Sequence, residues 1–390
     1  MKRLLFIFFS ILALNLYAQQ DKPIAFSCPP YLQELGTDAV TIVWHTTKPA
    51  FSWVELAEED GSNFQAKSRT KYYGTINGQI DAGSTIQKIR IKGLKPGTTY
   101  NYRLVSKEIL NYGAYSVSYG SWVSSDNHLG KIFSFSTLPE KIEKVSFIEV
   151  SDIHNNPDKL EVMLKNGGID NADLVLFNGD MTSEFSHESD LFDGFLKKSS
   201  DMFAATKPFL MVRGNHETRG LLSKDLMKYF PRTDNKYYFT KSYGPLFLIG
   251  LDCGEDKPDS DIAYSGLAAY DEYRTEQAEW LKKVFESSEF KNAQYKVVIC
   301  HISPLGGDGW HAQNDIKEKW LPILNKAGIT LMLCGHEHTF NYFKTNKEVN
   351  NFPIIIGSDK SCTRVDVSKD ALTTKVIDYD GKNILMLNIK

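Results

Sequence analysis

The stretch VSFIEVSDIH (Val145–His154) places a run of apolar residues directly before an aspartate and a histidine. Four later stretches repeat this arrangement, each with an apolar run followed at once by residues that bind metals. The carboxyl ends of the strands in an α/β sheet form its ligand-binding edge, so we expect all five endings to meet in one crevice. In chain order the endings are Asp152-Ile153-His154, Gly179-Asp180, Gly214-Asn215-His216-Glu217, His301, and Gly335-His336-Glu337-His338.

Each ending also has an ordinary structural interpretation. Asp180 is in a position to cap a helix, Gly214-Asn215 is a common turn sequence, and His301 resembles an ordinary core histidine. However, five of the nine histidines fall in these endings, and every ending follows an apolar run. The joint pattern therefore favours one functional site over unrelated caps and turns.

The region around these endings alternates apolar strands with amphipathic helices. Helical periodicity is clear over Thr275–Ser287 and Asp315–Lys326. This alternation predicts a layered α/β domain over residues 143–390, with further β structure near the carboxyl terminus completing a second sheet. The predicted strands are Val145–Val150, Asp173–Asn178, Phe209–Arg213, Leu246–Leu251, Tyr295–Cys300 and Ile329–Cys334, followed by Phe352–Ile356, Thr363–Val367 and Ile384–Ile389.

The preceding region, residues 24–139, has short β-rich runs separated by turns, which predicts an all-β sandwich. Val40–His45 is a strand that carries Trp44, and the turn Gly93–Thr99 leads into a strand that begins with Tyr100. We expect Tyr100 to tie the turn to this strand as a tyrosine corner. Leu138–Lys141 is the predicted linker to the α/β domain.

The amino terminus is typical of a secretory signal peptide, predicted to span residues 1–18. Lys2 and Arg3 precede the apolar run Leu4–Leu16, and the small residue Ala18 marks the cleavage site. The alternative, a membrane anchor, needs roughly 20 apolar residues, and this run is shorter. The sequence therefore predicts a periplasmic or secreted protein with no membrane contact after cleavage.

Composition limits the function further. A chain with 42% hydrophobic and 24% charged residues is not predominantly disordered. Loss of Lys2 and Arg3 with the signal peptide would change the formal net charge from −3 to −5, which does not favour a nucleic acid partner. The odd number of cysteines and the lack of a C-x-x-C spacing exclude a zinc framework or a disulfide scaffold. They are Cys28, Cys253, Cys300, Cys334 and Cys362.

Together the five endings resemble the motifs of the calcineurin-like metallophosphoesterase superfamily. The β-rich region ahead of them resembles a fibronectin type III domain, an arrangement found in the purple acid phosphatase branch. The resemblance implies a four-layer α/β/β/α sandwich preceded by an all-β fibronectin III-like sandwich. It also implies that one metal ion is bound by Asp152, His154 and His338, a second by Asn215, His301 and His336, with Asp180 bridging both and His216 over the substrate phosphate.

Such a pair of ions implies hydrolysis of phosphate esters through in-line attack by a metal-bound hydroxide, with Asp180 and His216 as the catalytic residues. The sequence departs from the purple branch at two positions. His154 stands where that branch has the glycine of Asp-x-Gly, and Ser183 stands where it has a tyrosinate ligand. The sequence therefore allows iron, manganese or zinc as the metals.

The leading hypothesis is a phosphomonoesterase of acid phosphatase type that acts on a small-molecule phosphate ester. One alternative is a phosphodiesterase or nucleotide hydrolase on the same centre. Another is a non-catalytic binding protein that contacts a glycan or a protein through its β domain and keeps a structural metal site. The loops Cys253–Ser265 and Gly306–Asn314 are the candidates for substrate selection, the latter containing Trp310 and His311.

Overall fold

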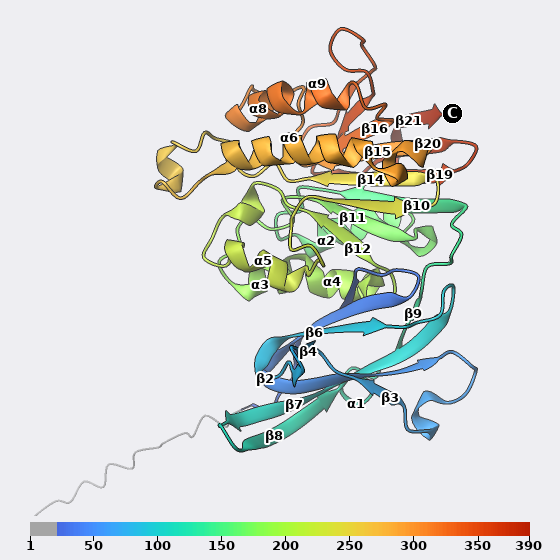
Figure 1. Cartoon of the computed structure of the whole chain (residues 1–390), viewed down its shortest axis with the longest axis vertical. Helices are drawn as coiled ribbons and strands as arrows, with labels where there is room; N and C mark the ends of the chain where they lie inside the picture. The colour runs from blue at the N-terminus through green and yellow to red at the C-terminus, as the bar shows by residue number, and fades with distance from the viewer. Residues whose placement is uncertain (1–21) are drawn as a thin grey trace, which may run out of the picture.

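The computed structural model describes residues 22–390, so the predicted signal peptide lies outside the described residues. A β sandwich at the amino-terminal end is followed by an α/β fold (Figure 1). This succession confirms the predicted fold class.

The β sandwich is organised around two long strands, β2 and β7. The first half of β2 pairs with β1 and β6, and its second half pairs with β7 and β3, so one continuous strand joins the two layers. The strands are β1 (Phe26–Gln33), β2 (Ala39–Glu58), β3 (Thr70–Tyr72), β6 (Ser84–Lys92), β7 (Thr99–Tyr112), β8 (Val117–Ser124) and β9 (Phe133–Ser136), with a separate hairpin of β4 (Thr75–Ile76) and β5 (Gln79–Ile80).

Two aromatic residues stabilise this sandwich through hydrogen bonds. Trp44 is fully buried, and its indole Nε1 donates a hydrogen bond to Ser106 Oγ at 3.1 Å. The hydroxyl of Tyr100 accepts the backbone N–H of Lys95 at 2.9 Å, which confirms the predicted tie between the turn and the strand.

The α/β fold contains two six-stranded sheets. The first has the order β12-β11-β10-β19-β20-β21, in which β10, β11 and β12 run parallel. The second has the order β13-β14-β15-β16-β18-β17, in which β14, β15, β16 and β18 run parallel. The bounds are β10 (Lys144–Val150), β11 (Leu174–Asn178), β12 (Phe209–Val212), β13 (Phe239–Tyr243), β14 (Leu246–Leu251), β15 (Tyr295–Cys300), β16 (Leu331–Cys334), β17 (Asn341–Phe343), β18 (Ile354–Ile356), β19 (Ser361–Ser368), β20 (Leu372–Asp378) and β21 (Asn383–Ile389).

The two sheets pack face to face through a shared apolar core, and helices cover their outer faces, giving the expected four layers. Phe147 of β10 and Ile299 of β15 both belong to the core between the sheets. Figure 1 shows α6, α8 and α9 on one side and α3, α4 and α5 on the other, toward the β sandwich. The helices are α1 (Ser125–His128), α2 (Pro157–Asn166), α3 (Glu188–Leu191), α4 (Lys197–Ser199), α5 (Leu226–Tyr229), α6 (Tyr270–Glu286), α7 (Ser288–Asn292), α8 (His311–Lys319) and α9 (Leu321–Leu324).

Two sequence-based details differ from the structure. The strands near the carboxyl terminus do not all complete the second sheet, because β19 to β21 extend the first one. The predicted helix Asp315–Lys326 is two helices, α8 and α9, which meet at Trp320. Pro322 lies in the first turn of α9, where its missing N–H costs no hydrogen bond, whereas it would break a helix interior.

The β sandwich is docked onto the α/β fold through buried contacts. Tyr31 donates its hydroxyl hydrogen to the carbonyl of Tyr229 at 2.8 Å, and Tyr102 donates to the carbonyl of Ala205 at 2.8 Å. All five cysteines are free and buried, as expected for core thiols. Among residues 22–390 we find no helix with the length and apolar character needed to cross a bilayer.

Candidate metal centre

All five predicted endings lie at the carboxyl ends of their strands, but the strands belong to different sheets. Asp152, Asp180 and Asn215 follow β10, β11 and β12 of the first sheet, whereas His301 and His336 follow β15 and β16 of the second. The crevice is therefore formed where the edges of two packed sheets meet. Backbone hydrogen bonds join neighbouring loops there, from the N–H of Asp152 to the carbonyl of Gly179 and from the N–H of Gly335 to the carbonyl of His301.

The structure brings the predicted side chains into two separate groups of three. Ligand atoms within 4.8 Å of one another are offered by Asp152, His154 and His338, and by Asp180, His301 and His336. The first group has the residues that the family resemblance implies for one ion, and the second contains His301 and His336 of the other set together with the expected bridge, Asp180. A third group, which contains His154, Asp180 and His216, connects them.

Asp180 belongs to the second group and also lies near the first. Its Oδ2 is 3.1 Å from His301 Nε2 on one side and 3.9 Å from His154 Nε2 on the other. In the first group, His338 Nε2 is 3.4 Å from Asp152 Oδ1 and 3.2 Å from His154 Nε2. A carboxylate in this position suits a bridge between two cations.

The chemistry of the donors fits metal ions. His301 donates its Nδ1 hydrogen to the carbonyl of Asn178 at 2.7 Å, which leaves Nε2 as the free donor atom for a cation. This Nε2 and the Oδ1 of Asn215 are both buried without a hydrogen-bond partner. Buried polar atoms are normally satisfied, and both of these atoms are of a type that can coordinate a cation.

The electrostatics of the crevice also favour positive charge. Asp152 and Asp180 are fully buried carboxylates, and burying a charge without a partner is costly. Burial by itself would lower the pKa of His301, yet the two carboxylates outweigh it and hold this pKa well above its usual value. Burial would raise the pKa of Asp180, but His301 holds it below its usual range. Metal ions would supply the same compensation.

Backbone conformation sets this crevice apart from the rest of the chain. Ten non-glycine residues in the described part of the chain have positive φ, and half of them are predicted metal ligands. Such conformations are unfavourable for side chains with a Cβ, and they cluster at functional sites. The five are Asp152 (φ 57°), His154 (49°), Asp180 (53°), His336 (74°) and His338 (53°).

Glycine is required beside two of these loops because the loops approach each other closely. A Cβ on Gly335 would lie 2.7 Å from Asp152 Oδ2, and one on Gly179 would lie 2.6 Å from His301 Nδ1. Both contacts are shorter than real Cβ atoms make. The Gly-Asp and Gly-His pairs in the endings therefore serve the packing of the crevice.

Comparisons with known proteins agree with this geometry. Residues 145–340 match the family described as calcineurin-like phosphoesterase, and residues 30–137 match the purple acid phosphatase N-terminal domain. The chain belongs to the calcineurin-like phosphoesterase family. The predicted resemblance to the superfamily and to its purple acid phosphatase branch is confirmed.

Curated relatives carry purple or acid phosphatase names. Purple acid phosphatase 21 of Arabidopsis thaliana is 24% identical over 278 residues, which cover 66% of this chain and 53% of the relative. Acid phosphatase type 7 of Mus musculus is 24% identical over 229 residues, which cover 57% of this chain and 47% of the relative. The chain thus spans about half the length of these relatives. The purple acid phosphatase PPD1 from yellow lupin seeds shares the fold, with a TM-score of 0.62 at 15% identity over 93% of this chain and 74% of its own.

Glu217, the last residue of its ending, holds the backbone of the loops around the crevice. It is fully buried, and its carboxylate accepts three backbone N–H groups from the loops after β11 and β12. The donors are Asp180 at 2.8 Å, Thr182 at 3.1 Å and Gly214 at 2.9 Å. Glu337 is only half-buried, and burial raises its pKa.

Sequence reasoning missed Arg219, which lies beside His216. Its Nη1 is 3.1 Å from His216 Nε2, and its Nε and Nη2 donate to the carboxylate of Glu255 at 2.8 Å and 3.0 Å. His216 itself is held by its Nδ1, which is 2.6 Å from the carbonyl of Ser183. Arg219 is close to His216 in the sequence, and this proximity was the only signal that it belongs to the site. Its partner Glu255, which fixes the guanidinium, is 36 residues farther along the chain.

The two loops proposed for substrate selection are positioned differently. The loop Cys253–Ser265 borders the crevice, because Glu255 holds Arg219 there. In the loop Gly306–Asn314, Trp310 lies under the ammonium of Lys257, at 5.4 Å from the ring centre. His311 is engaged away from the crevice, with its Nε2 2.7 Å from Asp271 Oδ1 of α6.

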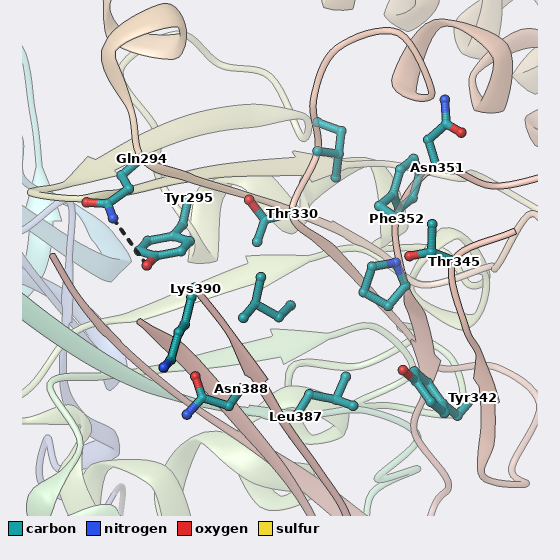
Figure 2. Close-up of a pocket in the computed structure, with 13 residues that line it drawn as sticks. Gln294, Tyr295, Thr330, Tyr342, Thr345, Asn351, Phe352, Leu387, Asn388 and Lys390 are labelled. Atoms are coloured by element: carbon teal, nitrogen blue, oxygen red, sulfur yellow. Dashed lines mark hydrogen bonds between the residues drawn. The ribbon is translucent and has the colours of Figure 1, made fainter. Parts of the chain in front are cut away.

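A cavity of about 490 Å³ lies far from these residues, at the opposite edge of the second sheet. Tyr295 and Thr330 line it at the amino ends of β15 and β16, together with Lys390 at the end of the chain (Figure 2). Because the carboxyl ends of the same strands carry His301 and His336, this cavity is not part of the metal centre.

Proposed function

We propose that the protein is an exported phosphoesterase that uses two metal ions to hydrolyse phosphate monoesters. The observation that carries the proposal is the pair of three-residue groups, which a third group links through His154 and Asp180. The buried atoms His301 Nε2 and Asn215 Oδ1, which have no hydrogen-bond partner, are further suitable ligands. The phosphatase names of the curated relatives support it.

Asp152, His154 and His338 would hold one ion, while Asn215, His301 and His336 would hold the other. Asp180 would contact both. Bound ions supply Lewis-acid stabilisation of phosphoryl oxygens and make a bound water more acidic. A shell of imidazole, carboxylate and amide donors suits iron, manganese or zinc.

The chain's own residues then position the substrate. The backbone N–H of His216 donates to Asp180 Oδ1 at 2.9 Å, and its ring is tethered through Nδ1 to the carbonyl of Ser183. With Nδ1 engaged there, Nε2 would hydrogen-bond the phosphate or give a proton to the leaving oxygen in exchange for its present contact with Arg219 Nη1 at 3.1 Å. The Nε2 lies 3.8 Å from Asp180 Oδ2, on the side of the crevice where the two groups meet.

The test couples metal analysis to two esters measured side by side. Purified protein should contain about two metal ions per chain and turn over p-nitrophenyl phosphate faster than its bis ester. Removal of the metals with a chelator should abolish turnover, and their return should restore it. Faster turnover of the bis ester would instead favour a phosphodiesterase. Full metal occupancy with no turnover of either ester would favour a non-catalytic binding protein.

Export rests on the amino-terminal sequence, in which Lys2 and Arg3 precede the apolar run Leu4–Leu16. Cleavage after Ala18 would leave a mature chain that begins at Gln19. Mass spectrometry of the protein recovered outside the cytoplasm should give this mature mass, and a full-length mass there would contradict the proposal.

A further inference from the structure

A second cavity lies next to His216. Its volume is about 510 Å³, and it lies between the segment Thr218–Lys224, which runs into η6 (Ser223–Asp225), and the loop that precedes α6. A cavity of this size suits a small organic group. None of the predicted metal ligands lines it.

Arg219 connects this cavity to the metal centre. Its side chain lines the cavity, and its Nη1 lies 3.1 Å from His216 Nε2, so the cavity begins one side chain away from His216. The rest of the guanidinium is clamped by Glu255, which also accepts a hydrogen bond from the hydroxyl of Tyr264 at 3.2 Å. Arg219 is therefore held in a fixed position between the cavity and His216.

The rim of the cavity is unusually apolar for exposed surface. Leu221 is 80% exposed and Leu267 is 91% exposed, and both line the cavity. The guanidinium of Arg219 is bound to Glu255 and His216, and the hydroxyl of Tyr264 is bound to Glu255, while the exposed Lys224 adds a positive charge to the lining. The cavity thus offers an incoming group apolar area, and exposed apolar side chains around a hollow are typical of a ligand site.

We propose that this cavity receives the organic part of the phosphate ester and selects esters of ring-sized apolar or aromatic alcohols over esters of small alcohols. The inference rests on the proposed function. If His216 hydrogen-bonds or protonates the leaving oxygen, the leaving alcohol must extend on the side of His216. Arg219 and the cavity lie on that side.

The first experiment measures binding without turnover. Calorimetry on the metal-loaded protein compares naphthylmethylphosphonate with methylphosphonate, neither of which is a phosphate ester. Wild type should bind the naphthyl compound roughly tenfold more tightly, which corresponds to about 1.4 kcal/mol and to burial of roughly 55 Å² of apolar surface. Equal affinities of wild type for the two phosphonates would overturn the inference.

Substitutions test whether this cavity causes the preference for the naphthyl compound. The double variant Leu221→Ser/Leu267→Ser should lose most of the naphthyl preference and keep its affinity for methylphosphonate. Ile262→Ser is the matched control, because Ile262 is 93% exposed in the same loop but does not line the cavity. An undiminished naphthyl preference in the double variant, or an equal loss in the control, would overturn the assignment.

Kinetics separate this inference from the proposed function. The double variant should raise KM for naphthyl phosphate roughly tenfold and leave KM for methyl phosphate unchanged. If wild type hydrolyses neither ester, the proposed function fails, and the phosphonate measurements still decide whether the cavity binds apolar groups. If wild type hydrolyses both esters with equal KM, the proposed function stands and the selectivity is refuted.

Discussion

The buried carboxylate of Glu217 holds the backbone of Asp180 by accepting its amide hydrogen at 2.8 Å. The same carboxylate accepts the amide hydrogen of Gly214 at 2.9 Å, so it joins the loop that carries Asp180 to the loop that carries Asn215. These loops bring their residues to the centre from β11 and β12. The geometry of the proposed site thus depends on a side chain that is not among the predicted metal ligands.

Glu217→Gln should weaken metal binding and destabilise the fold. A glutamine presents one acceptor oxygen and an NH₂ group that cannot accept the N–H donors now bound to the carboxylate, and each unsatisfied buried group costs about 1–3 kcal/mol. Chemical denaturation and competition with a metal chelator measure the two effects. Glu337→Gln is the matched control, since Glu337 is half-buried in a neighbouring ending. Equal losses of stability and metal affinity in the two variants would contradict the role of Glu217 in holding the two loops.

Asp180→Asn should preserve the fold and reduce the bound metal below two ions per chain. The amide has nearly the shape of the carboxylate, but it lacks the negative charge that offsets repulsion between two cations. Metal analysis after dialysis gives the stoichiometry, and circular dichroism verifies the fold. Two retained ions with full turnover would exclude Asp180 as the bridging residue.

The sequence pointed to the residues of the five endings, but not to the residues that hold the surrounding loops in place. The endings are local patterns, each an apolar strand followed by donors, so Asp152 and His301 were identifiable without knowing how the strands pair. Glu217 and Arg219 were not, because their roles depend on loops brought together by folding. Glu217 binds an amide 37 residues away, and Arg219 binds a carboxylate 36 residues away.

Iron-loaded protein should not be purple. The position where the related branch has a tyrosinate is Ser183, whose backbone N–H donates to Asn155 Oδ1 at 2.6 Å. A serine hydroxyl gives no phenolate-to-iron charge transfer, so the visible spectrum should lack an intense band. Such a band would mean that a tyrosine from elsewhere in the chain reaches the metal, and its survival in Ser183→Ala would exclude Ser183 as the source.

His216→Ala should keep both metals and lose roughly 10² to 10⁴ in turnover. If His216 protonates the leaving oxygen, an aryl phosphate should suffer less than an alkyl phosphate, because a good leaving group needs little protonation. If it only binds the phosphate, both esters should suffer alike. Metal content is measured on the same sample, since loss of an ion would imitate loss of the acid. Unchanged turnover of both esters would remove His216 from the mechanism.

His45 is fully buried where the β sandwich meets the α/β fold. Its ring stacks on Tyr229, with 5.3 Å between ring centres, and its Nε2 lies 3.1 Å from the hydroxyl of Tyr31. The hydroxyl hydrogen of Tyr31 goes to the carbonyl of Tyr229, so His45 Nε2 must donate to Tyr31. The Nδ1 then carries a buried lone pair with no partner.

A proton on Nδ1 would place an unpartnered charge in this interface. Burial, assisted by the nearby Lys88, lowers the pKa of His45 to about 3. In the unfolded chain a histidine has a pKa of about 6.5. Between these values the unfolded state binds the extra proton, so the free energy of unfolding should fall as the pH falls, by about 1.4 kcal/mol per pH unit.

Comparison with His45→Phe isolates this contribution, because protonation of the metal ligands affects both proteins equally. The variant should gain stability relative to wild type as the pH falls from 7.5 to 4.5, by about 2–3 kcal/mol, nearly all of it below pH 6.5. Urea denaturation at pH 7.5, 5.5 and 4.5 measures the difference. His187→Asn, at a histidine whose side chain is 79% exposed, should follow the wild-type profile. Parallel profiles for wild type and His45→Phe would show that His45 accepts a proton in the folded state as readily as in the unfolded chain.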